Sequence, residues 1–324
     1  MEQGKILSIV IPTLNRYEYL KRTLDCIIPQ VQRNIDKVEL VICCNSSKDE
    51  TDEYVKSLLI QYPFIRYKYF DEYVEVGQSL IRSVNEATGE YVVLWGDDDI
   101  PFPFFVDYVL SIIERKSDIG IIHLNRLEGK DTIYGIKDLK VFNGKYENEL
   151  VEYCLSDFIQ RFAVNLGFIS SLVFKRDIWL MGKDAYSPTH YGYEHLAIIM
   201  KGAKGQKCIY ANFPFEIQRN PYNRDFSTKW PLYNFLGIPN MMSDFDSWGL
   251  TSGAFETWQK RVNSSLINFL WNMFYTVLDR NTYKPLCKSL NKYQTSILRK
   301  CCTYVIVYTF PKWLFVFLKN KIYK

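Results

Sequence analysis

Three signatures that would place this chain in a familiar class are missing from its sequence. No G-x-G-x-x-G pattern follows the first apolar segment, which argues against a dinucleotide-binding oxidoreductase. A G-x-x-x-x-G-K-[ST] pattern is also absent, which argues against a P-loop NTPase. The eight cysteines include no C-x-x-C pair, and we interpret them as the reduced thiols of a cytoplasmic protein.

An export signal and a long apolar run are missing as well. The first residues lead into a short, mostly apolar segment without a small-residue cleavage site, so no signal peptide is predicted. The apolar stretch 301–318 is interrupted by Pro311 and Lys312, whereas a membrane-spanning helix needs about 20 apolar residues. Basic and aromatic residues lie in and around this stretch, which is typical of a segment in the membrane interface.

Acidic residues are missing from the last part of the chain. Residues 280–324 contain ten Lys or Arg and no Asp or Glu. Because the whole chain has a formal net charge of +4, residues 1–279 carry a net charge of −6. A basic tail on an acidic body predicts an anionic partner. The basic residues are interleaved with large aliphatic ones, which favours a membrane over nucleic acid, although a helix packed on the body or in a dimer is an alternative.

Among the features that are present, three consecutive carboxylates stand out. Asp97, Asp98 and Asp99 follow the apolar run Tyr91–Trp95, which has the length and composition of a strand buried on both faces. The triplet is therefore predicted at the carboxyl edge of a sheet, where open α/β sheets bind their ligands. Adjacent carboxylates repel one another unless a cation is near, which favours a divalent-metal site over a solvated acidic turn or a helix N-cap.

Apolar strands alternate with amphipathic helices through the first 225 residues, which indicates a parallel sheet with right-handed crossovers. Residues 125–149 are polar and predicted to be irregular. We assign residues 1–225 to an α/β domain and 226–324 to a helical region, in which 254–279 is predicted as one long helix. The segments predicted as strands are 6–11, 38–44, 64–70, 91–95, 119–124, 167–174, 207–211 and 213–219.

Four segments of the chain together resemble the family 2 glycosyltransferases. They are residues 8–16, residues 38–51, Gly77 with Arg82, and residues 88–99. They occur in the order and spacing of that family, and the resemblance covers roughly residues 5–125. Further along, residues 167–176 and the segment around His195 are similar to the bacterial O-antigen abequosyltransferase branch.

The resemblance implies the GT-A fold, a Rossmann-like, mostly parallel sheet flanked by helices, here with a helical C-terminal extension. It also implies transfer of a hexosyl or deoxyhexosyl group from a nucleotide-diphosphate-sugar to a glycan acceptor. The Q-x-x-R-W pattern of processive polysaccharide synthases is absent, so addition of a single sugar is expected. The residues implied in nucleotide-sugar binding are Pro12, Thr13, Asn15, Arg16, Cys44, Asn45, Arg82, Asp97, Asp98 and Arg219.

The same resemblance implies a divalent metal cofactor, Mn²⁺ or Mg²⁺. Such hard cations prefer carboxylate oxygen and stabilise the charge of a leaving diphosphate. The family pattern is usually Asp-x-Asp-Asp, and Gly96 stands at its first place in this chain. Asp98 then falls on the metal-binding position, and Asp99 is the second predicted ligand. Either Asp97 or Asp99 would contact the ribose or assist the metal.

Cys44 departs from the family pattern, in which an Asp usually accepts the N3–H of uracil. Cytosine presents an acceptor at N3, so a carboxylate facing it would be repelled. A cysteine at this place therefore weakens the case for a UDP donor and is compatible with a CDP-sugar. The alternative is that Cys44 is simply a buried strand residue.

The acceptor hydroxyl needs a base if the reaction inverts configuration. Many family members carry Glu-Asp at the start of a helix after the second half of the sheet, and Glu194-His195 occupies the comparable place here. Either side chain could take the proton: Glu194 as a carboxylate with an ordinary pKa, or His195 because histidine titrates near neutrality. A lone histidine is more often structural, so a purely structural role for His195 is the alternative.

Together these features predict a glycosyltransferase that acts on a lipid-linked acceptor in the synthesis of a bacterial surface polysaccharide, such as O-antigen or capsule. Its tail would hold it peripherally on the inner face of the cytoplasmic membrane. One alternative is a nucleotidyltransferase of related fold, although Leu14, Asn15 and Arg16 offer little of the basic, Gly-rich triphosphate loop that it needs. The other is a non-catalytic, membrane-associated nucleotide-sugar-binding protein.

Overall fold

The computed structural model describes residues 4–132, 135–142, 149–220, 229–263, 265–294 and 296–322. The chain forms two compact units, which we call the α/β unit and the helical unit. The α/β unit comprises Met1–Tyr186 and Glu194–Tyr222, and the helical unit comprises Ser187–Tyr193 and Asn223–Lys324. The short segment Ser187–Tyr193 therefore belongs to the helical unit although it interrupts the α/β unit in the sequence.

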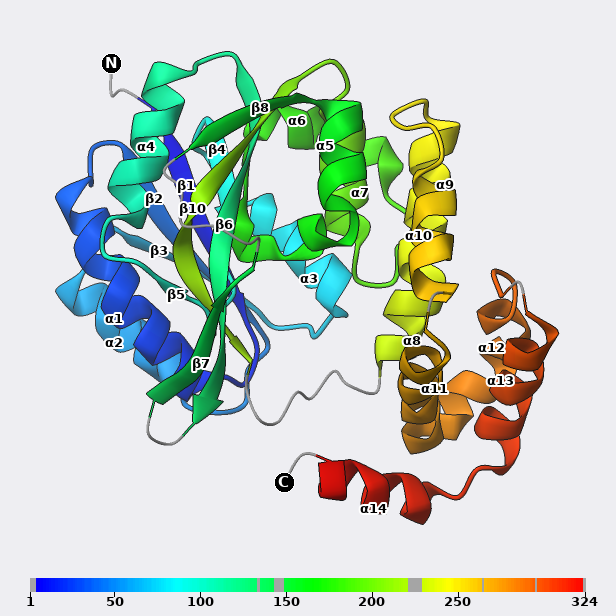
Figure 1. Cartoon of the computed structure of the whole chain (residues 1–324). Helices are drawn as coiled ribbons and strands as arrows, with labels where there is room; N and C mark the ends of the chain where they lie inside the picture. The colour runs from blue at the N-terminus through cyan, green and yellow to red at the C-terminus, as the bar shows by residue number, and fades with distance from the viewer. Residues whose placement is uncertain are drawn as a thin grey trace. The chain divides into compact units, whose positions relative to one another are not determined.

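The α/β unit is built on one mixed sheet with the strand order β3-β2-β1-β4-β9-β6-β10-β5 (Figure 1). Two further strands extend it, because β7 pairs with β6 and β8 pairs with β10. The strands are β1 (Leu7–Thr13), β2 (Val38–Asn45), β3 (Ile65–Phe70), β4 (Tyr91–Leu94), β5 (Ile100–Pro101), β6 (Ile119–Thr132), β7 (Gly135–Val141), β8 (Leu150–Cys154), β9 (Leu172–Lys175) and β10 (Lys207–Asn220).

The first half of the sheet is parallel, as the strand–helix alternation predicted. Strand β1 pairs in parallel with β2 and β4, and β2 pairs in parallel with β3. The direction changes at β9, which runs antiparallel to both β4 and β6. The carboxyl ends of β1, β2 and β4 therefore meet at one edge, and the acidic triplet follows β4 at this edge.

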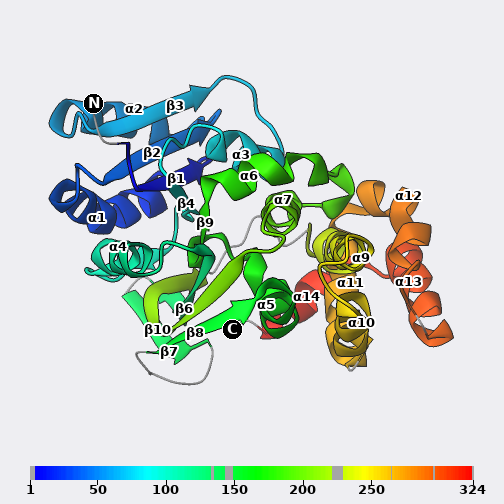
Figure 2. The same ribbon diagram turned by 90° about the horizontal axis from the view of Figure 1, so that it is seen from above.

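Two groups of helices cover the parallel half of the sheet. Helices α1 (Tyr17–Arg33), α2 (Thr51–Gln61) and α4 (Phe105–Arg115) lie on one face, and α3 (Val76–Val84), α6 (Arg176–Gly182) and α7 (Glu194–Gly202) lie on the other (Figure 2). Helix α1 forms because its apolar residues recur at a spacing near 3.6. This spacing puts Leu20, Leu24 and Ile27, all fully buried, on one stripe against the sheet.

The second half of the sheet differs from the sequence-based expectation in three places. Residues 125–149 were predicted to be irregular, but β6 continues to Thr132 and pairs with β7. Residues 167–174 were predicted as a strand, but only Leu172–Lys175 is one, and two short helical turns, η1 (Ala163–Gly167) and η2 (Ile169–Ser171), precede it. Strand β10 is a single strand whose register shifts around Pro214, because proline cannot donate a ladder hydrogen bond.

The helical unit packs around a core of its own, which includes Phe235, Phe269, Met273 and Val307. The predicted helix 254–279 is wrong as one piece, because Ser265 starts a new helix by accepting a hydrogen bond from the backbone N–H of Asn268. The main helices are α9 (Ile238–Ser247), α10 (Ala254–Asn263), α11 (Leu266–Phe274), α12 (Arg280–Leu290), α13 (Ile297–Thr309) and α14 (Lys312–Ile322).

A buried carboxylate ties three strands of the parallel half together. Glu39 on β2 accepts hydrogen bonds from the Ser8 hydroxyl (2.5 Å), the Thr88 backbone N–H (2.6 Å) and Arg66 (2.7 Å). Burial by itself raises the pKa of Glu39, but the hydrogen bonds from Ser8, Thr88 and Arg66 outweigh it, so the pKa lies below its ordinary value.

We expect Glu39→Gln to lower the free energy of unfolding at pH 7 by about 1–3 kcal/mol, because it removes charge-assisted hydrogen bonds at a buried site. Since the folded-state pKa is depressed, the stabilisation is present above the ordinary pKa of 4.5 and is lost as the pH falls through the folded value. Urea unfolding of both proteins between pH 7 and about pH 3 measures this.

The matched control is Glu114→Gln, because Glu114 makes an ion pair with Lys37 in which both side chains are about half exposed (49% and 50%). Its effect on the free energy of unfolding should stay below about 1 kcal/mol. An equal loss of stability in both variants, or a gap between Glu39→Gln and wild type that widens in acid, would contradict the prediction.

Candidate functional site

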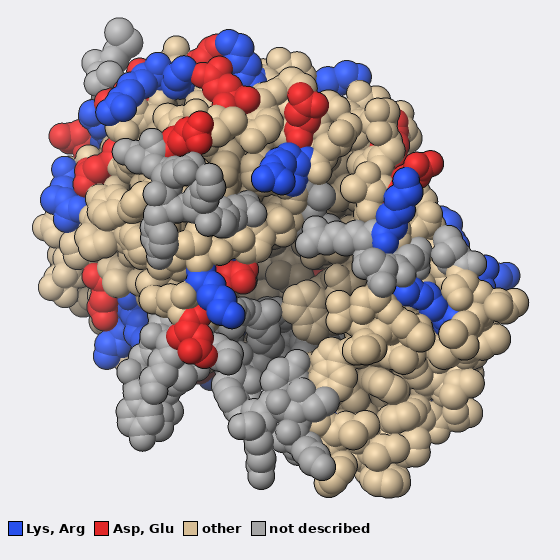
Figure 3. Space-filling model, viewed as in Figure 1, with Lys and Arg blue, Asp and Glu red and all other residues tan. Residues whose placement is uncertain are grey.

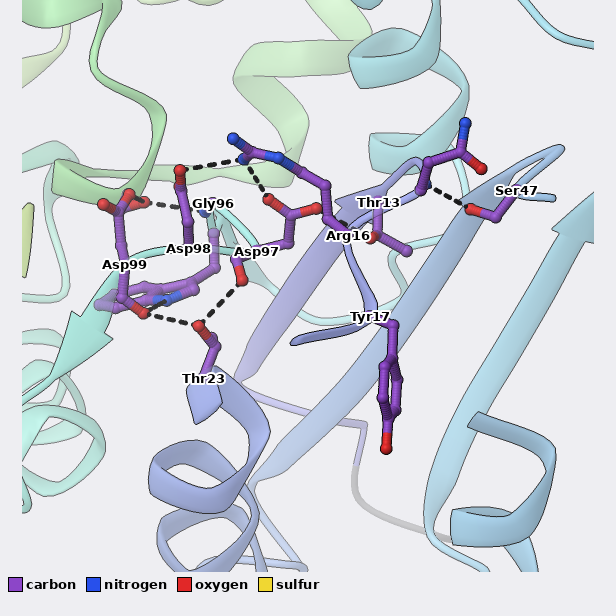
Figure 4. Close-up of polar contacts among 12 residues, drawn as sticks. Thr13, Arg16, Tyr17, Thr23, Ser47, Gly96, Asp97, Asp98 and Asp99 are labelled. Atoms are coloured by element: carbon purple, nitrogen blue, oxygen red, sulfur yellow. Dashed lines mark hydrogen bonds and ion pairs between the residues drawn. The ribbon is translucent and has the colours of Figure 1, made fainter. Parts of the chain in front are cut away.

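The acidic triplet and the end of β1 form one polar cluster at the carboxyl edge of the sheet. Arg16 donates hydrogen bonds from the same nitrogen to Asp97 and Asp98, each at 2.9 Å (Figure 4). The Thr13 hydroxyl donates to the second oxygen of Asp97 at 2.8 Å. The cation that three adjacent carboxylates require is therefore supplied by Arg16, directly after β1.

The backbone of the triplet is fixed from three sides. The Thr23 hydroxyl lies 3.0 Å from the Asp97 carbonyl oxygen and 3.1 Å from that of Asp99, which also accepts a hydrogen bond from the Trp95 indole at 3.1 Å. The Ser170 hydroxyl donates to the Asp99 carboxylate at 2.6 Å and accepts from the Gly96 N–H at 2.8 Å. Neither Thr23 nor Ser170 was predicted as a site residue, because both reach the triplet from segments that are distant from it in the sequence.

Burial decides the charge state of this cluster. It raises the pKa of Asp97 to about 6, with Arg16 opposing that rise and Asp98 adding to it. The pKa of Arg16 is raised above its ordinary value, because the two carboxylates outweigh the effect of burial. Asp98 is the more accessible carboxylate, with a side chain that is 17% exposed against 7% for Asp97.

Two polar turns join the ends of β1 and β2. Asn15 has a left-handed backbone (φ 52°), a conformation that asparagine tolerates better than most residues. Its side-chain oxygen accepts from the Lys48 N–H at 2.6 Å, and its own N–H donates to the Ser47 hydroxyl at 2.9 Å. The predicted residues Thr13, Asn15 and Arg16 thus lie in one connected turn, and Pro12 directly precedes it as a partner of Cys43 in the β1–β2 ladder.

Asn45 and Arg82, both predicted to bind the nucleotide, contact each other. Arg82 donates to the Asn45 side-chain oxygen and to the Glu72 carbonyl, and its guanidinium lies 3.9 Å from the centre of the Phe70 ring. Asn45 also exchanges hydrogen bonds with the backbone of Val74. These contacts hold the end of β2 against the segment that leads into α3.

Cys44 is fully buried and its side chain lies against Tyr67 on the neighbouring strand β3. The prediction that Cys44 faces the nucleotide base stays a prediction. Arg219 lies on β10, but its side chain is outside the described residues, so its predicted role stays open as well.

Glu194 and His195 begin α7, which packs against α3 and α6. Both residues are buried, at 7% and 2% exposure. The Glu194 carboxylate lies against Gly77 in the first turn of α3, and a methyl group built onto Gly77 would overlap it. A helix N-terminus carries a partial positive charge, so this position stabilises the ionised carboxylate.

In the part of the chain that the structure describes, no group of three or more His, Cys, Asp or Glu side chains is arranged to hold a metal ion. Mg²⁺ is usually held by one or two carboxylates together with the phosphates of a substrate. The acidic triplet fits a magnesium site of this kind, because Asp98 reaches the surface and its carboxylate is a hard oxygen ligand.

The fold is shared with proteins of known structure. The structure is similar to S. aureus TarS 1–349 in complex with UDP, with a TM-score of 0.57, 12% identity, and coverage of 98% of this chain and 92% of that one. It is also similar to a mannosyltransferase from Pyrobaculum calidifontis in complex with GDP-Man and Mn²⁺, with a TM-score of 0.52, 13% identity, and coverage of 94% and 88%. The expected GT-A fold with a helical C-terminal region is confirmed.

Sequence comparison then identifies the family. Residues 8–163 match the family model described as glycosyl transferase family 2. The chain is also 26% identical over 269 residues to the abequosyltransferase RfbV of Salmonella typhimurium, which covers 75% of this chain and 76% of that protein. Residues 8–163 of this protein therefore belong to glycosyl transferase family 2, as the four sequence segments predicted.

The contact between Gly77 and Glu194 gives a test of the Glu194 position. We expect Gly77→Ala to keep the fold, because alanine is favoured over glycine in a helix by up to about 1 kcal/mol and the overlapping group is the end of a flexible side chain. The added methyl group would displace the Glu194 carboxylate. If Glu194 is the base, turnover should fall about 100-fold with nucleotide binding retained, in parallel with Glu194→Gln.

Gly4→Ala is the matched control, because nothing lies within 4 Å of a methyl group added at Gly4. Urea unfolding measures stability, and release of the nucleotide from a nucleotide-sugar donor measures turnover. Normal turnover in Gly77→Ala would show that the carboxylate position is not needed for the reaction.

Proposed function

We propose that this glycosyltransferase moves a single sugar from a nucleotide-diphosphate-sugar to a glycan acceptor, which is lipid-linked and part of a bacterial surface polysaccharide. The observation that supports donor binding best is the Arg16–Asp97–Asp98 cluster at the carboxyl edge of the parallel strands. The relation to an abequosyltransferase supports an acceptor of the O-antigen type. The TarS and mannosyltransferase complexes, which contain UDP and GDP-Man, support a nucleotide-sugar donor.

In this proposal the nucleoside binds where β1 and β2 end. The turn of Thr13, Asn15 and Arg16 and the pair of Asn45 with Arg82 line these strand ends. Arg16 is then placed to contact the diphosphate, because guanidinium forms paired hydrogen bonds with phosphate oxygens. Cys44 is compatible with a cytidine donor, and a panel of UDP-, CDP-, dTDP- and GDP-sugars would identify the base.

We further propose Asp98 and Asp99 as the protein ligands of Mn²⁺ or Mg²⁺, with phosphate oxygens completing the coordination. When bound, such an ion stabilises the negative charge that the diphosphate gains as it leaves. Asp97 stays with Thr13 and Arg16 and keeps the latter in position. Glu194, or its neighbour His195, is the proposed base that takes the proton of the acceptor hydroxyl.

Asp98→Asn tests the metal site. The variant keeps a hydrogen-bond acceptor for Arg16 but loses the charge that a cation needs, so metal-dependent hydrolysis of the donor should fall by about 100-fold or more. Hydrolysis is measured as nucleotide release with Mn²⁺ or Mg²⁺ and with chelator. Because the wild-type rate also falls with chelator, the ratio between the two proteins should shrink when metal is removed.

Asp107→Asn serves as the control, because Asp107 pairs with Arg33 on the surface and both side chains are about half exposed. It should hydrolyse the donor at the wild-type rate. A rate for Asp98→Asn close to that of Asp107→Asn would refute the assignment of Asp98.

We also propose that α13 and α14 dock on the anionic inner face of the cytoplasmic membrane. No single helix of the described residues has the length and apolar character to cross a bilayer, and α13 and α14 reach that threshold only as a pair bent by 105°. Large apolar side chains point outward from both helices. The most exposed are Ile297 (80%), Trp313 (71%), Phe317 (59%) and Val305 (56%).

The distribution of charge also supports docking on an anionic membrane. On the face that Figure 3 shows, much of the helical unit carries few charged residues, whereas both signs are mixed over the α/β unit. The exposed cations Lys300 and Lys312 stand beside the apolar side chains of α13 and α14. Such a surface combines apolar burial with attraction to anionic lipid headgroups, each basic residue adding about 1 kcal/mol.

We expect the double variant Trp313→Ser/Phe317→Ser to bind vesicles that contain phosphatidylglycerol at least about tenfold more weakly, because two large apolar side chains no longer enter the bilayer. Co-sedimentation in low salt measures binding. Leu180→Ser/Met181→Ser is the matched control, since these residues are also exposed, at 48% and 59%, but lie on α6. A wild-type protein that stays in the supernatant would contradict membrane docking.

A further inference from the structure

A second polar group lies beside the acidic triplet and has no place in the contacts described so far. Glu216 on β10 is fully buried, and neither of its carboxylate oxygens has a hydrogen-bond partner. Arg126 on β6 is 4% exposed, and its Nη1 also has no hydrogen-bond partner. Both side chains interact electrostatically with each other and with Asp99.

The backbone brings the two residues together through a β-bulge. Asn125 pairs with Pro214 and Leu127 pairs with Ile217, so two residues of β10, Phe215 and Glu216, lie opposite the single residue Arg126. Bulges re-aim side chains and are common beside active sites. Glu216 also pairs with Pro101 on β5, which begins directly after Asp99.

The rest of the Arg126 guanidinium is firmly held. Its Nε donates to Gln218 at 2.7 Å and its Nη2 donates to Glu128 at 3.2 Å. The rings of Phe142 and Phe168 lie 3.6 Å and 4.3 Å from its central carbon. These contacts fix Arg126 and leave Nη1 as its one nitrogen without a hydrogen-bond partner. Arg126 interacts electrostatically with the Glu216 carboxylate but does not hydrogen-bond to it.

Arg126 Nη1 and the Glu216 carboxylate attract each other but form no hydrogen bond, so both keep unused hydrogen-bonding capacity. Buried polar groups without a partner are unfavourable, so a ligand that satisfies both has a strong energetic advantage. A hydroxyl group suits this pair, because it accepts one hydrogen bond and donates another.

We propose that Arg126 and Glu216 bind one hydroxyl group of the donor sugar and so contribute to selection of that sugar. The hydroxyl oxygen accepts from Arg126 Nη1, and the hydroxyl proton is donated to Glu216. This inference rests on the proposed function: the sugar is bonded to the diphosphate, so it must lie next to the site formed by Asp98 and Asp99. Because the pair is closed off from solvent, the sugar must displace a covering side chain to reach it.

Calorimetry on the full chain with Mn²⁺ tests this. The probes are UDP-glucose, UDP-GlcNAc, GDP-mannose and CDP-glucose, each compared with its free nucleoside diphosphate. Glu216→Gln and Arg126→Lys should weaken binding of the accepted nucleotide-sugar about 10- to 100-fold, the range for a hydrogen bond to a charged group. Binding of the free diphosphate should change less than about twofold.

Deoxy analogues of the accepted sugar give the sharper readout. Removing the bridging hydroxyl should weaken binding to the wild type about tenfold or more, and the same removal should have little effect in either variant. Glu152→Gln is the matched control, because Glu152 is an exposed carboxylate of β8 paired with Lys116, and it should behave as the wild type. If one variant fails to fold, the other carries the comparison.

Equal weakening of sugar-bound and free nucleotide in the variants would overturn the inference, since it indicates a structural role for the pair. So would a deoxygenation effect that persists in both variants. If the wild type binds none of the nucleotide-sugars or free nucleotides, the proposed function is wrong, and the inference falls with it. Binding of a free nucleoside diphosphate by the wild type distinguishes failure of this inference from failure of the proposed function.

Discussion

The ion pairs of Arg16 with Asp97 and Asp98 are the interaction on which the rest of the site depends. Three adjacent carboxylates on a buried edge repel one another, and burial alone pushes the Asp97 pKa upward. A guanidinium 2.9 Å from two of them makes the arrangement possible. It also joins the end of β1 to the end of β4, so the charge balance and the shape of the ligand-binding edge are set together.

The sheet changes direction beside this cluster, and that change separates two chemical environments. On the parallel side, β1 and β2 end in turns that are joined by hydrogen bonds between small polar side chains and backbone N–H groups, where the nucleotide is proposed to bind. On the mixed side, β6 and β10 contribute Arg126 and Glu216 from an irregular ladder. Ser170, just before β9, connects the two by holding Gly96 and Asp99. A donor with its nucleotide on one side and its sugar on the other would span this junction.

The helical unit uses its apolar residues in two ways. One set forms its core around Phe269, Met273 and Val307, and another set, including Trp313 and Phe317, points outward from α14. Apolar side chains at high exposure on two successive helices, with lysines between them, are unusual for a helix that only packs on its own unit. The proposed membrane contact accounts for this second set and would bring the enzyme to the proposed lipid-linked acceptor.

The sequence by itself determined the parallel half of the sheet, the position of Asp97–Asp99 after a buried strand, and the family. These features follow from local periodicity and from motifs in which neighbouring residues act together. Only the tertiary structure decided which groups meet across the chain: Arg16 with Asp97, Glu194 with Gly77, and Arg126 with Glu216. The strand continuing to Thr132 and the break before Leu266 were also missed, because pairing with β7 and a serine cap overrode the local pattern. Contacts between distant segments depend on strand order and register, and no local pattern records these.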